Sequence, residues 1–146
     1  MSDDAAPTIP ARILPKLHDR NRAFWTGGAD GQLMIARCTQ CALWVSPPAA
    51  DCPDCGGALV AHPVSSHGTV FTYTVNYQPF NPEVPVPYVI AIVELAEQAD
   101  LRIAANIVDC EPDSVYIGLP VEVRFERHHV DNDNVFVPVF APRTSA

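Results

Sequence analysis

The chain has 146 residues, of which 48% are hydrophobic, and a formal net charge of −8. This length fits one compact domain with a small added module, and no apolar run approaches the roughly 20 residues needed to cross a bilayer. From Cys38 onward, thirteen acidic residues accompany only four arginines. Nucleic acids and anionic lipids bind mainly to protein surfaces with a positive electrostatic potential. The composition therefore argues against both as partners, and we expect a soluble, cytoplasmic protein.

The first 30 residues are expected to form an arm and a short helix. Residues 1–17 hold three prolines among small and polar residues, which predicts a disordered arm. Within residues 18–30 we expect the N-terminal helix from His18 to Thr26, with Asp19 as its N-cap or in its first turn and Gly27-Gly28 ending it. A helix this short is not stable alone, so it must dock on another surface.

Two Cys-x-x-Cys pairs within residues 31–63 predict a metal site. Cys38 and Cys41 form the first pair, Cys52 and Cys55 the second, and ten residues separate the pairs. This spacing suits a tetrahedral four-cysteine site. Catalytic zinc normally has three protein ligands and an open position, whereas four thiolates close the site. We therefore predict one structural Zn²⁺ per chain, held in a zinc ribbon.

Two alternatives to zinc remain open from the residues. The segment Cys52-Pro53-Asp54-Cys55-Gly56 resembles a rubredoxin knuckle, which would hold iron, although Ala42 stands where the first knuckle would need glycine. Two disulfides are the other alternative, but no apolar signal-peptide core follows Met1. The fifth cysteine, Cys110, has acidic neighbours that disfavour a thiolate, so we expect an ordinary half-buried thiol.

The rest of the chain, residues 64–146, has the two-residue period of β-strands. Three short ribbon strands are expected at Gln32–Arg37, Leu43–Val45 and Ala58–His62. Five further strands are expected at Val70–Val75, Tyr88–Leu95, Leu101–Ile107, Val121–Glu126 and Val135–Val139, the last one short and preceded by a polar turn at 131–134. In the first of these five, Phe71, Tyr73 and Val75 form the predicted bulky apolar face. Five short strands after a zinc ribbon favour a small closed barrel such as the OB-fold, so the fold class is mainly β.

A series of short segments resembles a known family. In chain order they are Phe24-Trp25, Gly31-Gln32-Leu33, Arg37-Cys38-Thr39-Gln40-Cys41, Pro47-Pro48, Cys52-Pro53-Asp54-Cys55-Gly56, Gly68-Thr69-Val70-Phe71-Thr72-Tyr73-Thr74, Pro87-Tyr88-Val89-Ile90-Ala91 and Ile117-Gly118-Leu119-Pro120-Val121-Glu122-Val123. Together they cover about residues 18–127 and resemble the DUF35 family, whose members combine an N-terminal helix, a rubredoxin-like zinc ribbon and an OB-fold. The resemblance implies a non-catalytic accessory subunit. Its expected partner is a thiolase-like enzyme, or a related aldolase or hydratase, that acts on acyl-CoA thioesters.

Eight residues are candidates for binding acyl-CoA or the partner. Phe24 and Trp25 offer aromatic anchors, either for a partner or for the zinc ribbon. Between two barrel strands, the proline-rich loop 79–87 presents Phe80, Val84 and Val86, and its stiff backbone would lose little entropy on docking. The alternative for this loop is a stiff cover over the barrel mouth.

Three arginines complete the candidate set. Arg102, Arg124 and Arg127 suit phosphate recognition, but intervening glutamates favour surface ion pairs instead. If CoA binds, we expect much of its site to come from the partner. His128 and His129 end a predicted strand and point to opposite faces, so one shared site is not expected.

The residues contain no recognisable catalytic constellation. The Gly-rich phosphate loop, the Gly-x-Ser-x-Gly elbow and the His-Glu-x-x-His helix are all absent from the sequence. Two rival functions remain beside the accessory subunit. One is a single-stranded nucleic-acid-binding OB-fold module, which the acidic balance opposes. The other is a small iron-tetrathiolate redox carrier, which would be red where a zinc protein is colourless.

Overall fold

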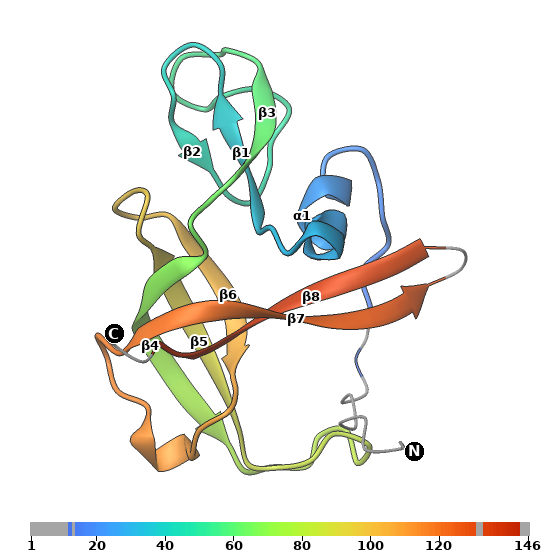
Figure 1. The fold of residues 1–146 in the computed structure, drawn as a ribbon, viewed down its shortest axis with the longest axis vertical. Helices are drawn as coiled ribbons and strands as arrows, with labels where there is room; N and C mark the ends of the chain where they lie inside the picture. Colours follow the sequence, from blue (N-terminus) through green and yellow to red (C-terminus); the bar gives the residue numbers. More distant parts are fainter. Residues whose placement is uncertain (1–11, 13, 131–132, 144–146) are drawn as a thin grey trace.

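A three-stranded ribbon sheet stands on a closed β-barrel, with one short helix beside their junction (Figure 1). The computed structural model describes residue 12, residues 14–130 and residues 133–143. Most of the predicted disordered arm, 1–17, lies outside these residues. The predicted fold class, mainly β with a short helix, a zinc ribbon and a five-stranded barrel, is confirmed. In the described part of the chain, no helix has the length and apolarity that a membrane crossing requires.

The ribbon sheet has the strand order β2-β1-β3. Its strands are β1 (Met34–Cys38), β2 (Trp44–Val45) and β3 (Leu59–Pro63), and both pairings are antiparallel. Each strand lies within two residues of its predicted position. The sheet is too small to bury a core of its own, so Ile35 and Trp44 pack into the core shared with the barrel.

The barrel closes in the order β4-β5-β6-β8-β7, which is the OB-fold arrangement. Its strands are β4 (His67–Asn76), β5 (Tyr88–Leu95), β6 (Arg102–Ile107), β7 (Pro120–Val130) and β8 (Asp133–Pro142), with a 3₁₀ turn η2 (Pro112–Ser114) before β7. The pairings are antiparallel except for β6 with β8, which meet in parallel at Ile107 and Phe140.

The predicted apolar face of β4 is only partly right: Val75 packs against the core, but a bulge in the strand changes the orientation of Phe71. The register to β5 shifts between Val70 and Thr72, and the extra residue turns Phe71 outward, where it is 44% exposed. Val70 is the buried residue of this stretch, while Tyr73 remains 36% exposed. A two-residue period cannot reveal a bulge, because one inserted residue reverses every side chain after it.

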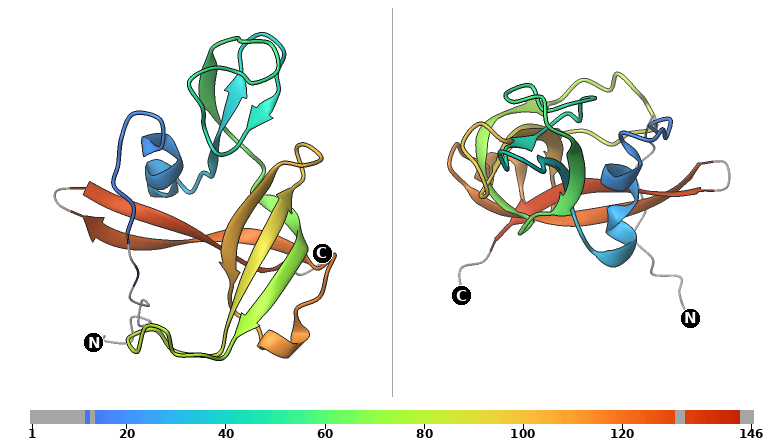
Figure 2. Two further views of the ribbon diagram at one scale, coloured as in Figure 1. Left: turned by 180° about the vertical axis from the view of Figure 1, so that it is seen from behind. Right: turned by 90° about the horizontal axis from the view of Figure 1, so that it is seen from above.

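The β7–β8 hairpin is longer than the sequence indicated. The predicted short strand Val135–Val139 is the ten-residue β8, and β7 pairs with it up to Val130. Asp131 and Asn132 of the predicted turn lie outside the described residues, whereas Asp133 and Asn134 belong to β8. Figure 2 shows the outer half of this hairpin projecting away from the barrel beneath the helix. The backbone hydrogen bonds between β7 and β8 extend the hairpin to Val130 and Asp133, although the polar residues there are typical of a turn.

The helix starts later than predicted and does not stop at its glycines. α1 covers Arg22–Thr26 with Asn21, not Asp19, at the N-cap, and a 3₁₀ helix η1 (Gly27–Asp30) continues it. The chain turns at Gly31, whose φ of +69° favours glycine. At Gly28, a Cβ atom would lie 2.4 Å from Cβ of Phe136 on β8. The glycine pair therefore serves close packing rather than termination.

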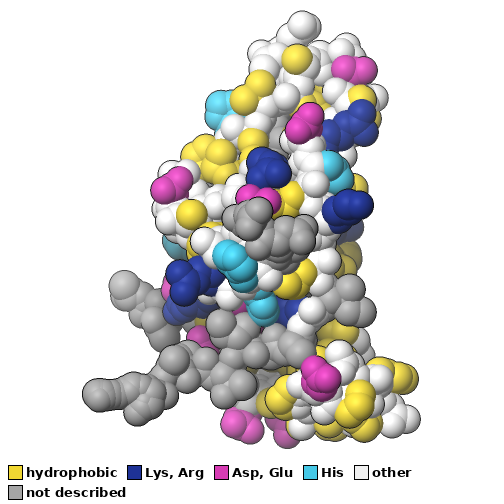
Figure 3. All heavy atoms as spheres, turned by 90° about the vertical axis from the view of Figure 1, so that its right-hand side faces the viewer, with side chains coloured by type: hydrophobic (Ala, Val, Ile, Leu, Met, Phe, Trp, Pro, Cys, Tyr) yellow, Lys and Arg dark blue, Asp and Glu magenta, His cyan; other side chains and the backbone are white. Residues whose placement is uncertain are grey.

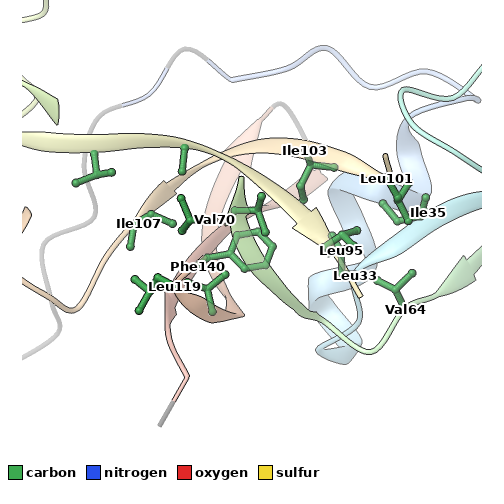
Figure 4. Packing of buried hydrophobic residues seen from close by; sticks show 14 of the residues in the cluster. Leu33, Ile35, Val64, Val70, Leu95, Leu101, Ile103, Ile107, Leu119 and Phe140 are labelled. Carbon is green, nitrogen blue, oxygen red and sulfur yellow. The ribbon is translucent and has the colours of Figure 1, made fainter. Parts of the chain in front are cut away.

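One hydrophobic core runs through both modules (Figure 4). Phe140 and Val70 lie in the barrel interior, and Leu33 and Ile35 extend the same cluster to the base of the ribbon. The β5–β6 turn also joins the modules, because Gln98 accepts a hydrogen bond from the Trp44 N–H at 3.0 Å and donates one to its C=O at 3.0 Å. The ribbon is thus fixed to the barrel by packing and by this amide pair.

Gln98→Ala should loosen the ribbon from the barrel. The substitution leaves the N–H and C=O of Trp44 without their partner, which costs about 1–3 kcal/mol when such groups are removed from water. Chemical denaturation with hydrogen exchange at the Trp44 amide would measure the loss. Gln78→Ala is the matched control, since the Gln78 side chain makes no hydrogen bond within the described residues. Equal stability of the two variants would contradict the role of Gln98.

Candidate metal centre and apolar groove

The four predicted cysteine ligands converge at the tip of the ribbon. Their Sγ atoms all lie within 4.8 Å of one another, with Cys38 and Cys55 at 3.4 Å and Cys41 and Cys52 at 3.6 Å. A tetrahedral zinc with Zn–S bonds of about 2.3 Å places sulfur atoms about 3.8 Å apart. The geometry fits one such ion, held by two knuckles that β1 and the turn before β3 bring face to face.

Backbone donors beside two of the sulfurs, those of Cys38 and Cys52, also suit thiolate ligands. The N–H groups of Cys41 and Gln40 donate to Sγ of Cys38, and they lower the pKa of Cys38 from 9.0 to about 6. The N–H of Asp54 donates to Sγ of Cys52. At Gly57 a Cβ atom would lie 2.8 Å from Sγ of Cys38, so the backbone passes close to the cluster. A metal-binding knuckle typically has backbone N–H groups that donate to its sulfur atoms and a backbone that passes close to them without an intervening side chain.

A second feature is a largely apolar groove of about 580 Å³ between the helix, the barrel and the hairpin. It is lined by Arg12, Pro15, Phe24, Trp25, Asn81, Val84, Pro85, Tyr88, Ile90, Ala104, Ala105, Asn106, Ile107, Val108, Glu126, Val137 and Pro138. Small side chains at Ala104 and Ala105 keep its floor open on β6. In OB-folds, the second and third barrel strands and their loops form the usual ligand-binding face, and β5 and β6 hold that place here.

The charges in the groove neutralise each other. Arg12 donates to both carboxylate oxygens of Glu126, with Nε–Oε1 at 2.6 Å and Nη2–Oε2 at 3.2 Å. His128 Nε2 lies 3.3 Å from the same Oε1. Burial raises the pKa of Glu126, but the hydrogen bonds from Arg12 and His128 outweigh burial and lower the pKa below its usual value. The groove therefore presents an ion pair, not a free cation for phosphate.

The structure brings together only part of the predicted binding set. Phe24, Trp25 and Val84 line the groove. Phe80 does not line it and is 81% exposed on the loop between β4 and β5. Val86 is half-buried on the same loop and also stays outside the groove. Figure 3 shows hydrophobic side chains gathered over this loop at the lower end of the molecule.

The three predicted arginines lie outside the groove. Arg102 stacks over Phe71 at 3.7 Å from the ring centroid and pairs with Glu94 and Asp100. Arg124 pairs with Glu122 at 2.5 Å, so ion pairing, the favoured alternative for these arginines, holds for both. Arg127 is exposed on β7.

The histidine pair lies inside β7, because the strand continues to Val130 instead of ending before it. As predicted, the two rings diverge: His128 faces Glu126, and Nδ1 of His129 lies 2.9 Å from Oδ1 of Asn134. The free thiol of Cys110 is partly buried against the core, as expected.

Sequence reasoning missed most of the groove. The sequence predicts a disordered arm around Arg12 and a surface ion pair for Glu126. The alanines on β6 were counted only as part of a strand. Small residues at the centre of the OB binding face were the one available signal, because they leave room where larger side chains would fill the surface.

Two family models match consecutive parts of the chain. The model described as "ChsH2, rubredoxin-like zinc ribbon domain" matches residues 25–60. The model described as "ChsH2, C-terminal OB-fold domain" matches residues 61–126. The first places the cysteine cluster in a zinc-binding module, and the metal expected at these cysteines is therefore zinc.

Similar proteins cover both modules. A "DUF35 domain-containing scaffold protein" of Methanocaldococcus jannaschii is 41% identical over 105 residues, which cover 70% of this chain and 73% of the relative. A "Probable enoyl-CoA hydratase alpha subunit" of Thermomonospora curvata is 35% identical over 85% of this chain, but the chain spans only 38% of that relative. In a solved "Ltp2-ChsH2(DUF35) aldolase", a chain with 34% identity superposes with a TM-score of 0.73, covering 88% of this chain and 98% of that one. The protein belongs to the DUF35 family, in its two-module form of zinc ribbon and OB-fold.

Proposed function

We propose that this protein is a non-catalytic accessory subunit of an enzyme acting on acyl-CoA thioesters. The partner would be a thiolase-like enzyme, or a related aldolase or hydratase. The subunit would stabilise or complete the acyl-CoA site of that partner. The observation that carries the proposal is the match to the DUF35 chain of the aldolase complex, which this chain covers over 98% of its length.

The apolar groove supports the proposal for a non-catalytic role. Its ionisable side chains are Arg12, Glu126 and Tyr88, and the first two are engaged with each other. Among the described residues that line it, no nucleophile lies next to a general base, which is the arrangement that covalent catalysis uses. The surface can receive apolar groups but offers no chemistry of its own, so the reacting groups would belong to the partner.

In this proposal Cys38, Cys41, Cys52 and Cys55 bind one structural zinc. When bound, the ion ties the two knuckles together and replaces the core that so small a sheet cannot bury. The thiolates would hold the ribbon in the shape that sets β1 and the helix beside the barrel. Reduced thiolates of this kind also support the expected cytoplasmic location.

Affinity purification of the tagged protein from its native host tests the proposal. We expect a thiolase-like or other acyl-CoA enzyme to co-purify in near-stoichiometric amount, and the isolated subunit to show no turnover of acyl-CoA thioesters. Recovery of the subunit alone, or turnover without a partner, would contradict the accessory role. Co-purified nucleic acid would favour the OB-fold alternative, which the net charge of −8 opposes.

Two apolar residues on the β4–β5 loop, the exposed Phe80 and the half-buried Val84, are proposed partner contacts. The double substitution Phe80→Ser and Val84→Ser should weaken partner binding at least tenfold, because it removes apolar area from the loop without touching the barrel core. Isothermal titration with the purified partner would measure the change. Val60→Ser is the matched control, since Val60 is an exposed apolar residue on the ribbon strand β3. Equal affinity for the double variant and the wild type would exclude the loop from the interface.

A further inference from the structure

The outer edge of β7 is an unpaired strand edge. β4 pairs with β7 only from Pro120 to Glu122, and the last bond on this side joins the Val123 N–H to the Ser66 C=O at 3.0 Å. On the side of β7 that faces β8, the Pro120 C=O accepts a hydrogen bond from the N–H of Arg143, the residue after the end of β8. Backbone groups of an antiparallel strand alternate between its two neighbours. Residues of odd number on β7 therefore turn their N–H and C=O away from β8.

Three residues beyond Val123 carry such outward groups. Phe125, Arg127 and His129 each present one N–H and one C=O on this edge. Within the described residues, none of these groups has a hydrogen-bond partner. An open edge of this length is a template for one more strand.

The two edges of the hairpin differ in accessibility. The helix and η1 pack against β8, where Gly28 meets Phe136, and β6 meets β8 at its barrel end. Within the described residues, β7 has no backbone hydrogen-bond partner on this edge beyond Ser66, although the N-terminal segment crosses the hairpin in the view from behind in Figure 2. An added strand can therefore pair with β7 without breaking any backbone hydrogen bond of the described residues.

The charges along the outer edge of β7 indicate which kind of strand can pair with it. The free segment runs from Arg124 to Val130, so a symmetric pair of two copies using its whole length would have its two-fold axis at Arg127. That pairing sets Arg127 opposite Arg127 of the second copy, and like charges directly opposite each other destabilise a sheet. Glu126 is engaged by Arg12 and Glu122 by Arg124. Arg127 is exposed and forms no ion pair within the described residues, so it can attract a carboxylate.

We propose that the outer edge of β7 receives an extended, carboxylate-bearing strand of the partner subunit. The proposal rests on the proposed function, since it needs that subunit. Backbone hydrogen bonds to Phe125, Arg127 and His129 hold the strand in antiparallel or parallel register. An acidic side chain of the strand pairs with Arg127 and fixes its position along the edge.

Amide hydrogen exchange in the purified complex tests the proposal directly. The N–H groups of Phe125, Arg127 and His129 should exchange at least tenfold more slowly in the complex than in the isolated subunit. The N–H groups of Arg124 and Glu126, which face β8, should change little and serve as the internal control. The wild-type protein suffices for this measurement, so it does not depend on the folding of any variant.

Two substitutions of Arg127 distinguish the contribution of its backbone N–H to partner binding from that of its charge. Arg127→Ala removes the charge but keeps the N–H, and should weaken partner binding several-fold. Arg127→Pro also removes the outward N–H, and because that group does not face β8, the hairpin ladder keeps its bonds. It should weaken binding at least tenfold beyond the alanine variant. Zinc content and melting temperature of both variants should match those of the wild type.

The outcomes distinguish this proposal from the function on which it rests. A complex in which the three edge amides exchange as fast as in the free subunit overturns the strand proposal alone. Equal affinity of a folded Arg127→Pro and Arg127→Ala does the same. If no acyl-CoA enzyme associates with the wild-type protein, the accessory function fails, and the strand proposal fails with it.

Discussion

Cys38→Ser is expected to abolish zinc binding and to unfold the ribbon. Structural zinc contributes apparent binding free energies of about 10–16 kcal/mol in zinc-finger peptides, which exceeds what a sheet of three short strands gains by packing. Cys38 is the ligand with the most support, since it receives two backbone N–H groups and lies against Gly57. Metal analysis should fall from close to one zinc per chain to none, and amides of β1 and β3 should lose protection from exchange.

Cys110→Ser provides the control for this experiment. Cys110 is a free thiol that lies outside the cysteine cluster, so its substitution should leave zinc content and ribbon protection unchanged. A Cys38→Ser protein with stoichiometric zinc and a protected ribbon would show that the site does not depend on all four thiolates. The absorbance of the wild-type protein separates the metals, since iron tetrathiolates are red and zinc tetrathiolates are colourless.

Phe140→Ala should produce the largest loss of barrel stability. Phe140 is fully buried at 0% exposure, and it lies where β8 pairs with both β7 and β6. Truncating a buried phenylalanine costs about 3–5 kcal/mol, because the lost contacts leave a cavity. At roughly 2–4 °C per kcal/mol for a domain near 150 residues, the melting temperature should fall by at least about 6 °C. Differential scanning calorimetry would measure it.

The same substitution on the surface is the matched control. Phe80→Ala removes an equal number of atoms from a ring that is 81% exposed, so the free energy of unfolding should change by no more than about 0.5 kcal/mol. Comparable losses for the two variants would mean that Phe140 is not the centre of a packed barrel. The comparison of Phe140→Ala with Phe80→Ala distinguishes a phenylalanine that stabilises the barrel from one that is exposed for contact with a partner.

The groove differs from the binding face of an OB-fold that takes up single-stranded nucleic acid. OB-folds that bind single strands use basic grooves with stacking aromatic residues. Here the corresponding face holds small apolar residues on β6, with Phe24 and Trp25 beside them. Its single arginine, Arg12, is engaged by Glu126. The face has therefore kept the position of an OB binding site while losing the free positive charge that phosphates require.

Where local rules apply, the sequence predicted the structure closely. The strand Tyr88–Leu95 was predicted with its observed bounds, because a nearly continuous apolar run of this length is typical of a central barrel strand. The cysteine cluster was also predicted, since two-residue gaps close a knuckle within one turn. The bulge at Phe71 and the length of β8 were not, because both depend on the strand alongside and not on the segment itself.

The sequence alone determined the metal module, the number of barrel strands and the net negative charge. Each of these follows from residues close together in the chain or from composition. Only the tertiary structure decided the groove and the open edge of β7. Arg12, Phe24, Val84 and Glu126 are dispersed over more than a hundred positions, and closure of the barrel brings them to one face. Which strand edge stays unpaired likewise depends on where β4 leaves β7, a long-range contact that no local pattern encodes.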